Sequence, residues 1–223
     1  MNGPPIRALW KTEPAPVRDN PVRRGVVAFC MRAARREAMR VRSAMHSKAE
    51  ITARAKAAAR YRPARVRLLL VAEAPPCDTS RYFYFDDVKN HDWLYVYVCR
   101  GLFGEVEIAD LRERKGEYLR ALCDGGVFMI DVAPDGMSSP KLTQLKPLVP
   151  DLVSRCVAIK PEAIVLIKSS VYDVAFEALR DGGLPVIDER MPFPASGQQP
   201  AFLRAFADAL EETKLKLPLA RPE

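Results

Sequence analysis

The sequence has few of the residues that hold metals or form disulfides. It contains only 2 histidines and 5 cysteines in 223 residues, and the cysteines are widely spaced, without a CxxC pair. An odd number of scattered cysteines argues against a disulfide framework and for a reducing compartment, so we expect a cytoplasmic protein. The same scarcity predicts no metal site, and we expect no cofactor. The cysteines are Cys30, Cys77, Cys99, Cys123 and Cys156.

The sequence also lacks a long hydrophobic run. Hydrophobic residues make up 48% of the chain, but no uninterrupted run reaches the roughly 18 residues that indicate a membrane-spanning helix. We therefore expect no membrane partner. A chain of 223 residues can form one substantial domain with its own core, and we expect a monomer.

The net charge of +7 is unevenly distributed along the chain. Residues 1–60 contain 14 Lys/Arg and 4 Asp/Glu, whereas the rest of the chain contains 21 and 24. Residues 1–60 thus read as a basic arm rich in Pro, Arg and Ala, partly helical or disordered, with a plain basic helix favoured over an organellar transit segment. Such an arm would attract nucleic-acid phosphates without sequence preference. The body then spans 61–215 and a short tail spans 216–223.

Strand-like and helix-like segments alternate through the body. The sequence predicts strands at about 66–72, 127–132, 163–168 and 185–188, and helices at about 108–123, 143–159, 170–180 and from about 200 onward. The stretch 92–103 is compatible with either a strand or a helix. This alternation predicts an α/β fold of three layers, α/β/α, around a central four-stranded parallel sheet.

Acidic side chains follow two of the predicted strands. Glu73 comes after the first strand on a turn stiffened by prolines, and Asp131 ends the second. Because ligands bind at the carboxyl ends of parallel strands, we expect both residues to lie in a candidate site, and the resemblance given below implies that they are catalytic. A buried strand followed by a solvated glutamate explains the Glu73 segment about as well.

Aromatic and basic residues supply the candidate binding groups. The segment Arg81-Tyr-Phe-Tyr-Phe85 offers rings that stack on a base and an arginine that binds phosphate. The loop before the last helix would present unpaired backbone N–H groups to an anion, although Ser196 could equally cap that helix and Lys168 could be solvated. The candidate base-binding residues are Tyr82, Phe83, Phe85 and Ala74. The candidate phosphate-binding residues are Arg81, Lys168, Ser196, Gly197 and Gln198.

The order of these motifs resembles the uracil-DNA glycosylase superfamily, most closely its family 4 and 5 branches. The first motif reads Ala72-Glu-Ala-Pro-Pro76, where those families have roughly Gly-Glu-Ala-Pro-Gly. Asp131 occupies the place of an asparagine at a strand end, and Phe193-Pro-Ala-Ser196 stands where the family has His-Pro-Ser. The resemblance covers about residues 64–210 and implies a uracil-DNA glycosylase-like fold. The iron–sulfur cluster of family 4 is not implied, because the cysteines do not fall at its spacings.

The resemblance implies a divergent DNA N-glycosylase, a hydrolase of base-excision repair that would remove uracil or another altered base from DNA, including single-stranded DNA. Glu73 would activate the water. An ionised Asp131 accepts hydrogen bonds but cannot donate them, so it would suit a base with an exocyclic amine unless burial protonates it. The alternative is a catalytically silent module of the same fold that binds nucleic acid or a nucleotide-like ligand. A third reading is a small-molecule α/β enzyme that acts on nucleosides or phosphoesters.

Overall fold

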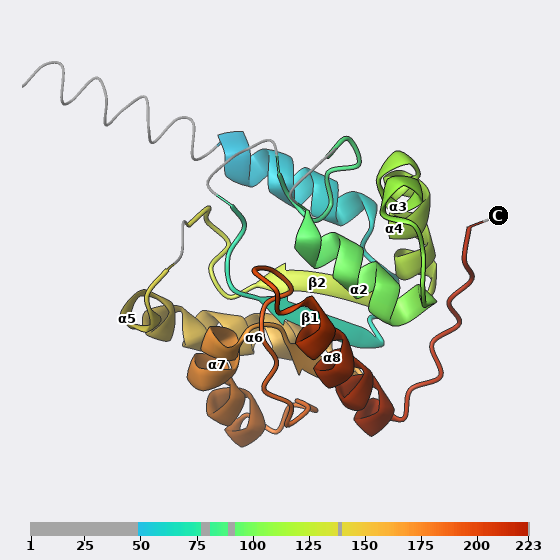
Figure 1. Cartoon of the computed structure of the whole chain (residues 1–223). Helices are drawn as coiled ribbons and strands as arrows, with labels where there is room; N and C mark the ends of the chain where they lie inside the picture. Colours follow the sequence, from blue (N-terminus) through green and yellow to red (C-terminus); the bar gives the residue numbers. More distant parts are fainter. Residues whose placement is uncertain (1–48, 77–80, 89–91, 138–139, 223) are drawn as a thin grey trace, which may run out of the picture. The chain divides into compact units, whose positions relative to one another are not determined.

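The computed structural model describes residues 49–76, 81–88, 92–137 and 140–222. These residues belong to one unit, His46–Glu223. Its centre is a parallel sheet of three strands in the order β2-β1-β3 (Figure 1). The strands are β1 (Leu68–Ala72), β2 (Val127–Asp131) and β3 (Ala163–Leu166). Most of the predicted basic arm, together with Cys77 and His91, lies outside the described residues.

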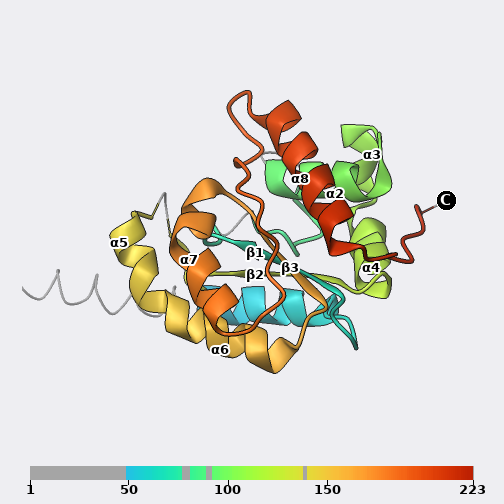
Figure 2. The ribbon, with the colours of Figure 1, turned by 90° about the horizontal axis from the view of Figure 1, so that it is seen from below.

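The sheet is parallel because each connection between its strands crosses over through helices. Every residue of β1 and β3 is buried, as expected for parallel strands whose two faces are both covered. Figure 2 shows the covering layers, with α2 (Trp93–Phe103) and α8 (Gln199–Thr213) on one face of the sheet. The helix over 49–60 and α6 (Val149–Ile159) cover the other face. The predicted mixed α/β class is therefore confirmed.

The remaining elements complete the crossovers. Between β1 and β2 the chain forms α3 (Ile108–Glu113) and α4 (Lys115–Asp124) after α2, and α7 (Ser169–Asp181) follows β3. The connection from β2 to β3 passes through α5 (Leu142–Leu145) and a 3-10 turn, Lys146–Leu148, before α6. No helix among the described residues is both long and apolar enough to cross a membrane.

Most predicted elements appear close to their expected positions, and the differences have local causes. The ambiguous stretch 92–103 is a helix, α2. The single helix expected at 108–123 is two helices, because the chain leaves helical geometry at Arg114. The helix expected at 143–159 is interrupted. Pro147 lies in the 3-10 turn and Pro150 in the first turn of α6.

The fourth strand expected at 185–188 is present only as an isolated parallel bridge between Ile164 and Val186. Pro185 has no N–H to donate, and the Val186 N–H bonds locally to Leu184 O at 2.8 Å. Two hydrogen bonds form the bridge: the Ile164 N–H donates to Pro185 O and the Ile187 N–H donates to Ile164 O, both at 2.8 Å. The sheet has three regular strands and one bridged edge, not four strands.

Two segments that the sequence analysis placed outside the body pack against it. From the helix over 49–60, Arg54 is buried, and Ala57 and Ala58 contact the hydrophobic core. In the C-terminal tail, Leu217 and Leu219 also pack on the core. The α/β unit thus extends beyond 61–215 at both ends.

The helices α2 and α8 approach each other closely at one glycine. A Cβ atom added to Gly101 would lie 2.3 Å from Phe206 Cδ1 and 2.8 Å from Phe206 Cε1. Phe206 is fully buried and stacks on Phe202, so its ring has little room to move. The absence of a side chain at Gly101 therefore sets how closely the two helices pack.

We expect Gly101→Ala to lower the free energy of unfolding by about 1–3 kcal/mol through overpacking, despite the better helix propensity of alanine. The measurement is urea denaturation followed by circular dichroism. Gly116→Ala is the matched control, because its Cβ would meet its nearest neighbours at 3.6 Å, an ordinary contact. Equal stability changes for the two variants would contradict the close packing of α2 on α8.

Candidate functional site

Three strand ends meet at one edge of the sheet. In the register of the parallel strands, Ala72 pairs with Asp131 and Val71 pairs with Leu166. The pairing continues one step further, because the Ala133 N–H donates to Glu73 O at 3.0 Å. The segments after β1, β2 and β3 therefore leave the sheet side by side, as the sequence predicts for a ligand site.

Glu73 is held by two side chains that follow β3. Its side chain is only 12% exposed, and its carboxylate forms an ion pair with Lys168 Nζ. Ser170 Oγ donates to the other carboxylate oxygen, Oε1, at 2.5 Å. Each oxygen of Glu73 thus has one donor, which fixes the orientation of the carboxylate.

Lys168 reaches Glu73 from an unusual backbone conformation. Its φ of 86° lies in the region that non-glycine residues rarely adopt, at the residue that precedes α7. Such strain is found where the surrounding structure fixes a side chain in place. The predicted phosphate role of Lys168 therefore has a competitor, because its ammonium group already pairs with Glu73.

Asp131 is in a different environment from Glu73. Burial raises the pKa of Asp131 from 3.8 to about 7, although the nearby charges of Arg155 and Arg54 act against this shift. Arg155 does not bond to the carboxyl group but donates to the backbone, to Asp131 O and Val132 O, both at 2.9 Å. At neutral pH the Asp131 carboxyl is therefore present in both its protonated and its ionised form.

Arg54 is a charged residue of this site that the sequence analysis missed. It is only 4% exposed, and its Nη2 donates to Pro76 O at 2.9 Å. Its guanidinium lies where a side chain at Gly136 would be, because a Cβ there would come within 3.0 Å of Nη2. Its Nε atom is buried without a hydrogen-bond partner. Arg54 thus joins the loop after β1 to the loop after β2, beside Asp131.

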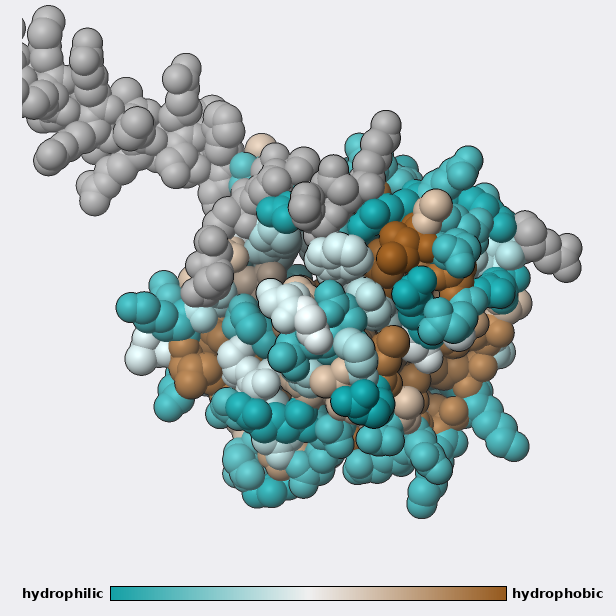
Figure 3. Space-filling model, in the orientation of Figure 1, coloured by the Kyte–Doolittle hydropathy of each residue, from teal (hydrophilic) through white to brown (hydrophobic). Residues whose placement is uncertain are grey.

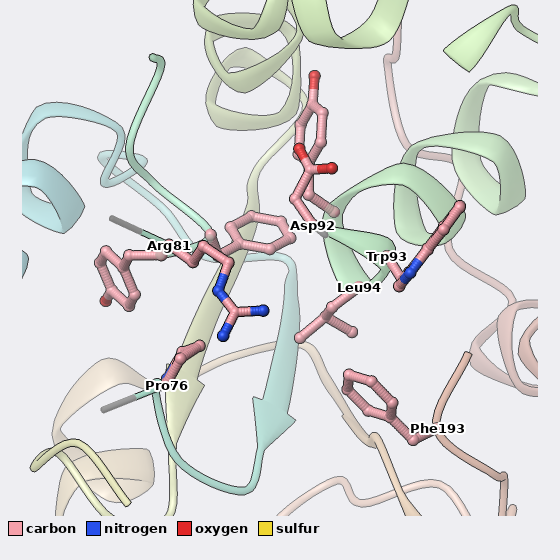
Figure 4. Close-up of a pocket in the computed structure, with 9 residues that line it drawn as sticks. Pro76, Arg81, Asp92, Trp93, Leu94 and Phe193 are labelled. Atoms are coloured by element: carbon pink, nitrogen blue, oxygen red, sulfur yellow. The ribbon is translucent and has the colours of Figure 1, made fainter. Parts of the chain in front are cut away.

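An aromatic pocket lies next to the loop that carries Glu73. Its volume is about 110 Å³. In Figure 4, Pro76 and Arg81 lie on one side, and Leu94, Trp93 and Phe193 lie on the other. Phe193 is 37% exposed, between two prolines that stiffen its loop. We call this site the aromatic pocket. Its full lining is Pro76, Arg81, Tyr82, Phe83, Asp92, Trp93, Leu94, Tyr95 and Phe193.

On the face of the molecule shown in Figure 3, most side chains are hydrophilic. The hydrophobic side chains that remain visible form separate small groups, including one over α2 and one at α5, the helix that carries the exposed Leu142. The aromatic pocket therefore lies near one of several small apolar surfaces.

The structure brings some of the predicted binding residues together and leaves others apart. Arg81, Tyr82 and Phe83 line the aromatic pocket, whereas Phe85 packs its ring edge-to-face on Tyr82, with centroids 5.3 Å apart. Ala74 packs against the hydrophobic core. Burial raises the pKa of Tyr82 well above its usual range, so its hydroxyl stays protonated.

The predicted anion loop before α8 forms a tight turn. Ser196 and Gly197 both have positive φ, and the Gln198 N–H donates to Ala195 O at 3.0 Å, which together describe a turn of the I′ kind. All three predicted residues, Ser196, Gly197 and Gln198, are exposed, and none lines the aromatic pocket. Ser196 does not cap α8, whose N-cap residue is Gln198.

The pocket residues Trp93, Leu94 and Phe193 were not predicted as binding residues. Nothing in the sequence distinguishes Trp93 from a residue that packs the first crossover. The stretch 92–103, which forms α2, was compatible with either a strand or a helix. The only signal for Phe193 is its position in the Pro-rich loop that resembles the last glycosylase motif. Among the described residues, no group of three or more His, Cys, Asp or Glu side chains is placed to hold a metal ion.

The chain matches no protein-family model and no curated protein.

The raised pKa of Asp131 gives the protein a specific pH dependence. The folded state keeps a proton that the unfolded state releases between about pH 4 and 7, so stability falls as pH rises through this window. Asp131→Asn removes this loss. We expect the variant to match the wild type near pH 4 and to exceed it by roughly 2–4 kcal/mol in free energy of unfolding above pH 7.

This expectation is checked by urea denaturation of both proteins at a series of pH values. Asp135→Asn is the control, because Asp135 is an exposed carboxylate on the same loop. The control should keep the pH profile of the wild type. Parallel profiles for Asp131→Asn and the wild type would show that Asp131 is ionised in the fold throughout this range.

Proposed function

We propose that this chain is a divergent DNA glycosylase-like protein that hydrolyses the N-glycosidic bond of uracil or another altered base in DNA. The observation that carries the proposal is the placement of two acidic groups, Glu73 and Asp131, at the ends of adjacent strands beside an aromatic pocket. The parallel sheet, with a bridge at Val186 where a fourth strand was expected, supports a uracil-DNA glycosylase-like fold.

Glu73 is the residue suited to act on water and on the sugar. Departure of the base leaves positive charge on the sugar, and an ionised carboxylate stabilises that charge and orients the attacking water. Lys168 and Ser170 hold the Glu73 carboxylate in one orientation. Because a carboxylate has about four lone-pair sites, two donors leave room for a bound water.

Asp131 is suited to read the edge of the base. With a pKa of about 7, its protonated form donates to a carbonyl such as O4 of uracil, and its ionised form accepts from an exocyclic amine. The two forms would favour different bases below and above neutral pH. The base itself would be removed from the DNA stack to reach these groups.

The aromatic pocket supplies stacking surface for a base. Tyr82, Phe83 and Phe193 line it together with Arg81, which pairs well with phosphate. Stacking of a base on an aromatic side chain contributes about 1–3 kcal/mol in proteins that bind single strands. The unpaired thiols Cys99, Cys123 and Cys156 fit a reducing compartment, and we propose the cytoplasm.

A second candidate is a catalytically silent module that binds DNA or a nucleotide-like ligand at the same place. One observation favours it: the ion pair with Lys168 and the bond from Ser170 occupy both oxygens of Glu73. These two donors compete with a water molecule for the lone pairs of the carboxylate. In addition, Phe193 stands where the resembling family has a histidine, so this position offers the leaving base no imidazole to stabilise its charge.

The test is a panel of single- and double-stranded oligonucleotides that carry uracil, hypoxanthine, xanthine or alkylated bases, with abasic sites revealed by alkaline cleavage. We expect Glu73→Gln to reduce turnover by roughly 10²–10⁴-fold and to leave oligonucleotide binding intact. Glu113→Gln, a change at an exposed carboxylate on α3, is the control and should keep wild-type turnover. Binding without cleavage of any member of the panel would reject the enzyme in favour of the silent module.

A further inference from the structure

Lys115, the first residue of α4, is buried behind the aromatic pocket. Its side chain is 0% exposed, which is rare for a lysine. Its Nζ donates to Tyr82 O at 3.4 Å, lies 3.8 Å from Asp92 Oδ2 and sits 4.5 Å from the centre of the Tyr95 ring. Tyr82, Asp92 and Tyr95 all line the pocket. One buried ammonium group therefore contacts three wall residues from two segments of the chain.

The contacts continue from Asp92 to a fourth wall residue. Asp92 Oδ1 accepts from Arg112 Nε at 3.0 Å, and Arg112 Cζ lies 5.5 Å from the centre of the Trp93 ring. The Asp92 side chain is only 5% exposed, and in Figure 4 its carboxylate points away from Pro76 and Phe193. Its Oδ2 atom is buried without a hydrogen bond. Lys115 Nζ forms an ion pair with this oxygen at 3.8 Å.

We propose that Lys115 is a positioning residue of the aromatic pocket, whose ammonium group holds the Tyr82, Asp92 and Tyr95 walls together. When the amine is neutral, Asp92 loses one of its two neighbouring cations and the contact with the Tyr95 ring loses its electrostatic attraction. The walls then loosen and the pocket binds its ligand more weakly. That the ligand is a base rests on the proposed function, but the positioning role does not.

The charges around Lys115 place this change close to neutral pH. Burial lowers the pKa of Lys115 from 10.5 to about 8, and Asp92, Cys99, Asp87 and Asp86 act against this shift. The facing groups are Asp92, Tyr95 and Cys99 from α2 and its N-cap, Tyr82, Asp86 and Asp87 from the segment 81–88, and Arg112 from α3.

The facing thiol and phenols do not titrate in the same range. Burial raises the pKa of Cys99 to about 12 and raises the pKa values of Tyr95 and Tyr82 above their usual range. Lys115 is therefore the group that loses its proton between pH 7 and 9, whereas the facing thiol and phenols keep theirs.

Loosening of the pocket would not be general unfolding. The unfolded lysine keeps its proton to a higher pH than the folded one, so the contribution of Lys115 to stability increases as pH rises from about 8. Weaker binding and higher stability in the same pH range would therefore separate the two effects.

The experiment uses the fluorescence of Trp93, because the chain has only two tryptophans, Trp10 and Trp93. In a full-length Trp10→Phe protein, Trp93 alone reports on the pocket wall. We expect its emission to change with a midpoint near pH 8 and no loss of circular dichroism signal. The change should vanish in Lys115→Met, which has no charge at any pH, and in Lys115→Arg, which keeps its charge.

Binding of a fluorescein-labelled single-stranded oligonucleotide that contains uracil gives the second readout. We expect its affinity to fall between pH 7 and 9 by roughly two- to tenfold more in the wild type than in Lys115→Arg, the effect of losing one hydrogen-bonded contact. Any change caused by Asp131 is common to both proteins and cancels in this comparison. The proposal would be overturned if the pH dependence of Trp93 emission were unchanged in Lys115→Met. It would also be overturned if Trp93 emission did not change with pH in the Trp10→Phe protein. This second test does not require any Lys115 variant to fold.

The two readouts also separate the two proposals. A Trp93 titration that depends on Lys115, together with no oligonucleotide binding at any pH, supports the positioning role and rejects DNA as the ligand. Binding with the same pH dependence in the wild type and in Lys115→Arg rejects the positioning role and leaves the DNA proposal standing.

Discussion

The arrangement of this protein depends on the burial of its central strand. All five residues of β1 are buried, and β1 pairs in parallel with β2 on one side and β3 on the other. Because β1 is paired on both sides, the chain reaches solvent only beyond the ends of this strand. The first polar residue after β1 therefore lies at the edge of the sheet. Glu73 is that residue, and the parallel pairing brings Asp131 and the Lys168 segment to the same edge.

The aromatic segment after β1 serves both the core and the pocket. The Tyr84 hydroxyl accepts from Met129 N at 2.6 Å and donates to Met129 O at 3.2 Å. β2 has β1 on only one side, so Tyr84 satisfies backbone groups at its otherwise unpaired edge. This anchor fixes the neighbouring rings of Tyr82 and Phe83 at the pocket. The segment therefore contributes to the core through Tyr84 and lines the aromatic pocket through Tyr82 and Phe83.

The sequence alone predicted the parts of this structure that depend on local pattern. The hydrophobic runs predicted the positions of the three strands. It did not predict contacts between distant residues, such as the ion pair of Lys168 with Glu73, which are 95 positions apart. Arg54 looked like any other arginine of a basic segment, and Lys115 like a solvated residue of a surface helix, because burial of a charge leaves no local signal. The prediction of a fourth strand was wrong for a similar reason. The residue pattern at 185–188 favours a strand, but Pro185 has no N–H and the Val186 N–H bonds locally to Leu184 O.

The buried charges of the molecule are concentrated around this one edge of the sheet. Arg54 and Lys115 are the charged residues that are buried among the described part of the chain, and both contact loops that line or border the aromatic pocket. Burial of a charge costs stability unless it is paired, and neither residue is fully satisfied by its partners. A core built only for stability would place apolar residues at these positions. Their presence here, in a core that is apolar elsewhere, marks this edge of the sheet as the candidate site of the molecule.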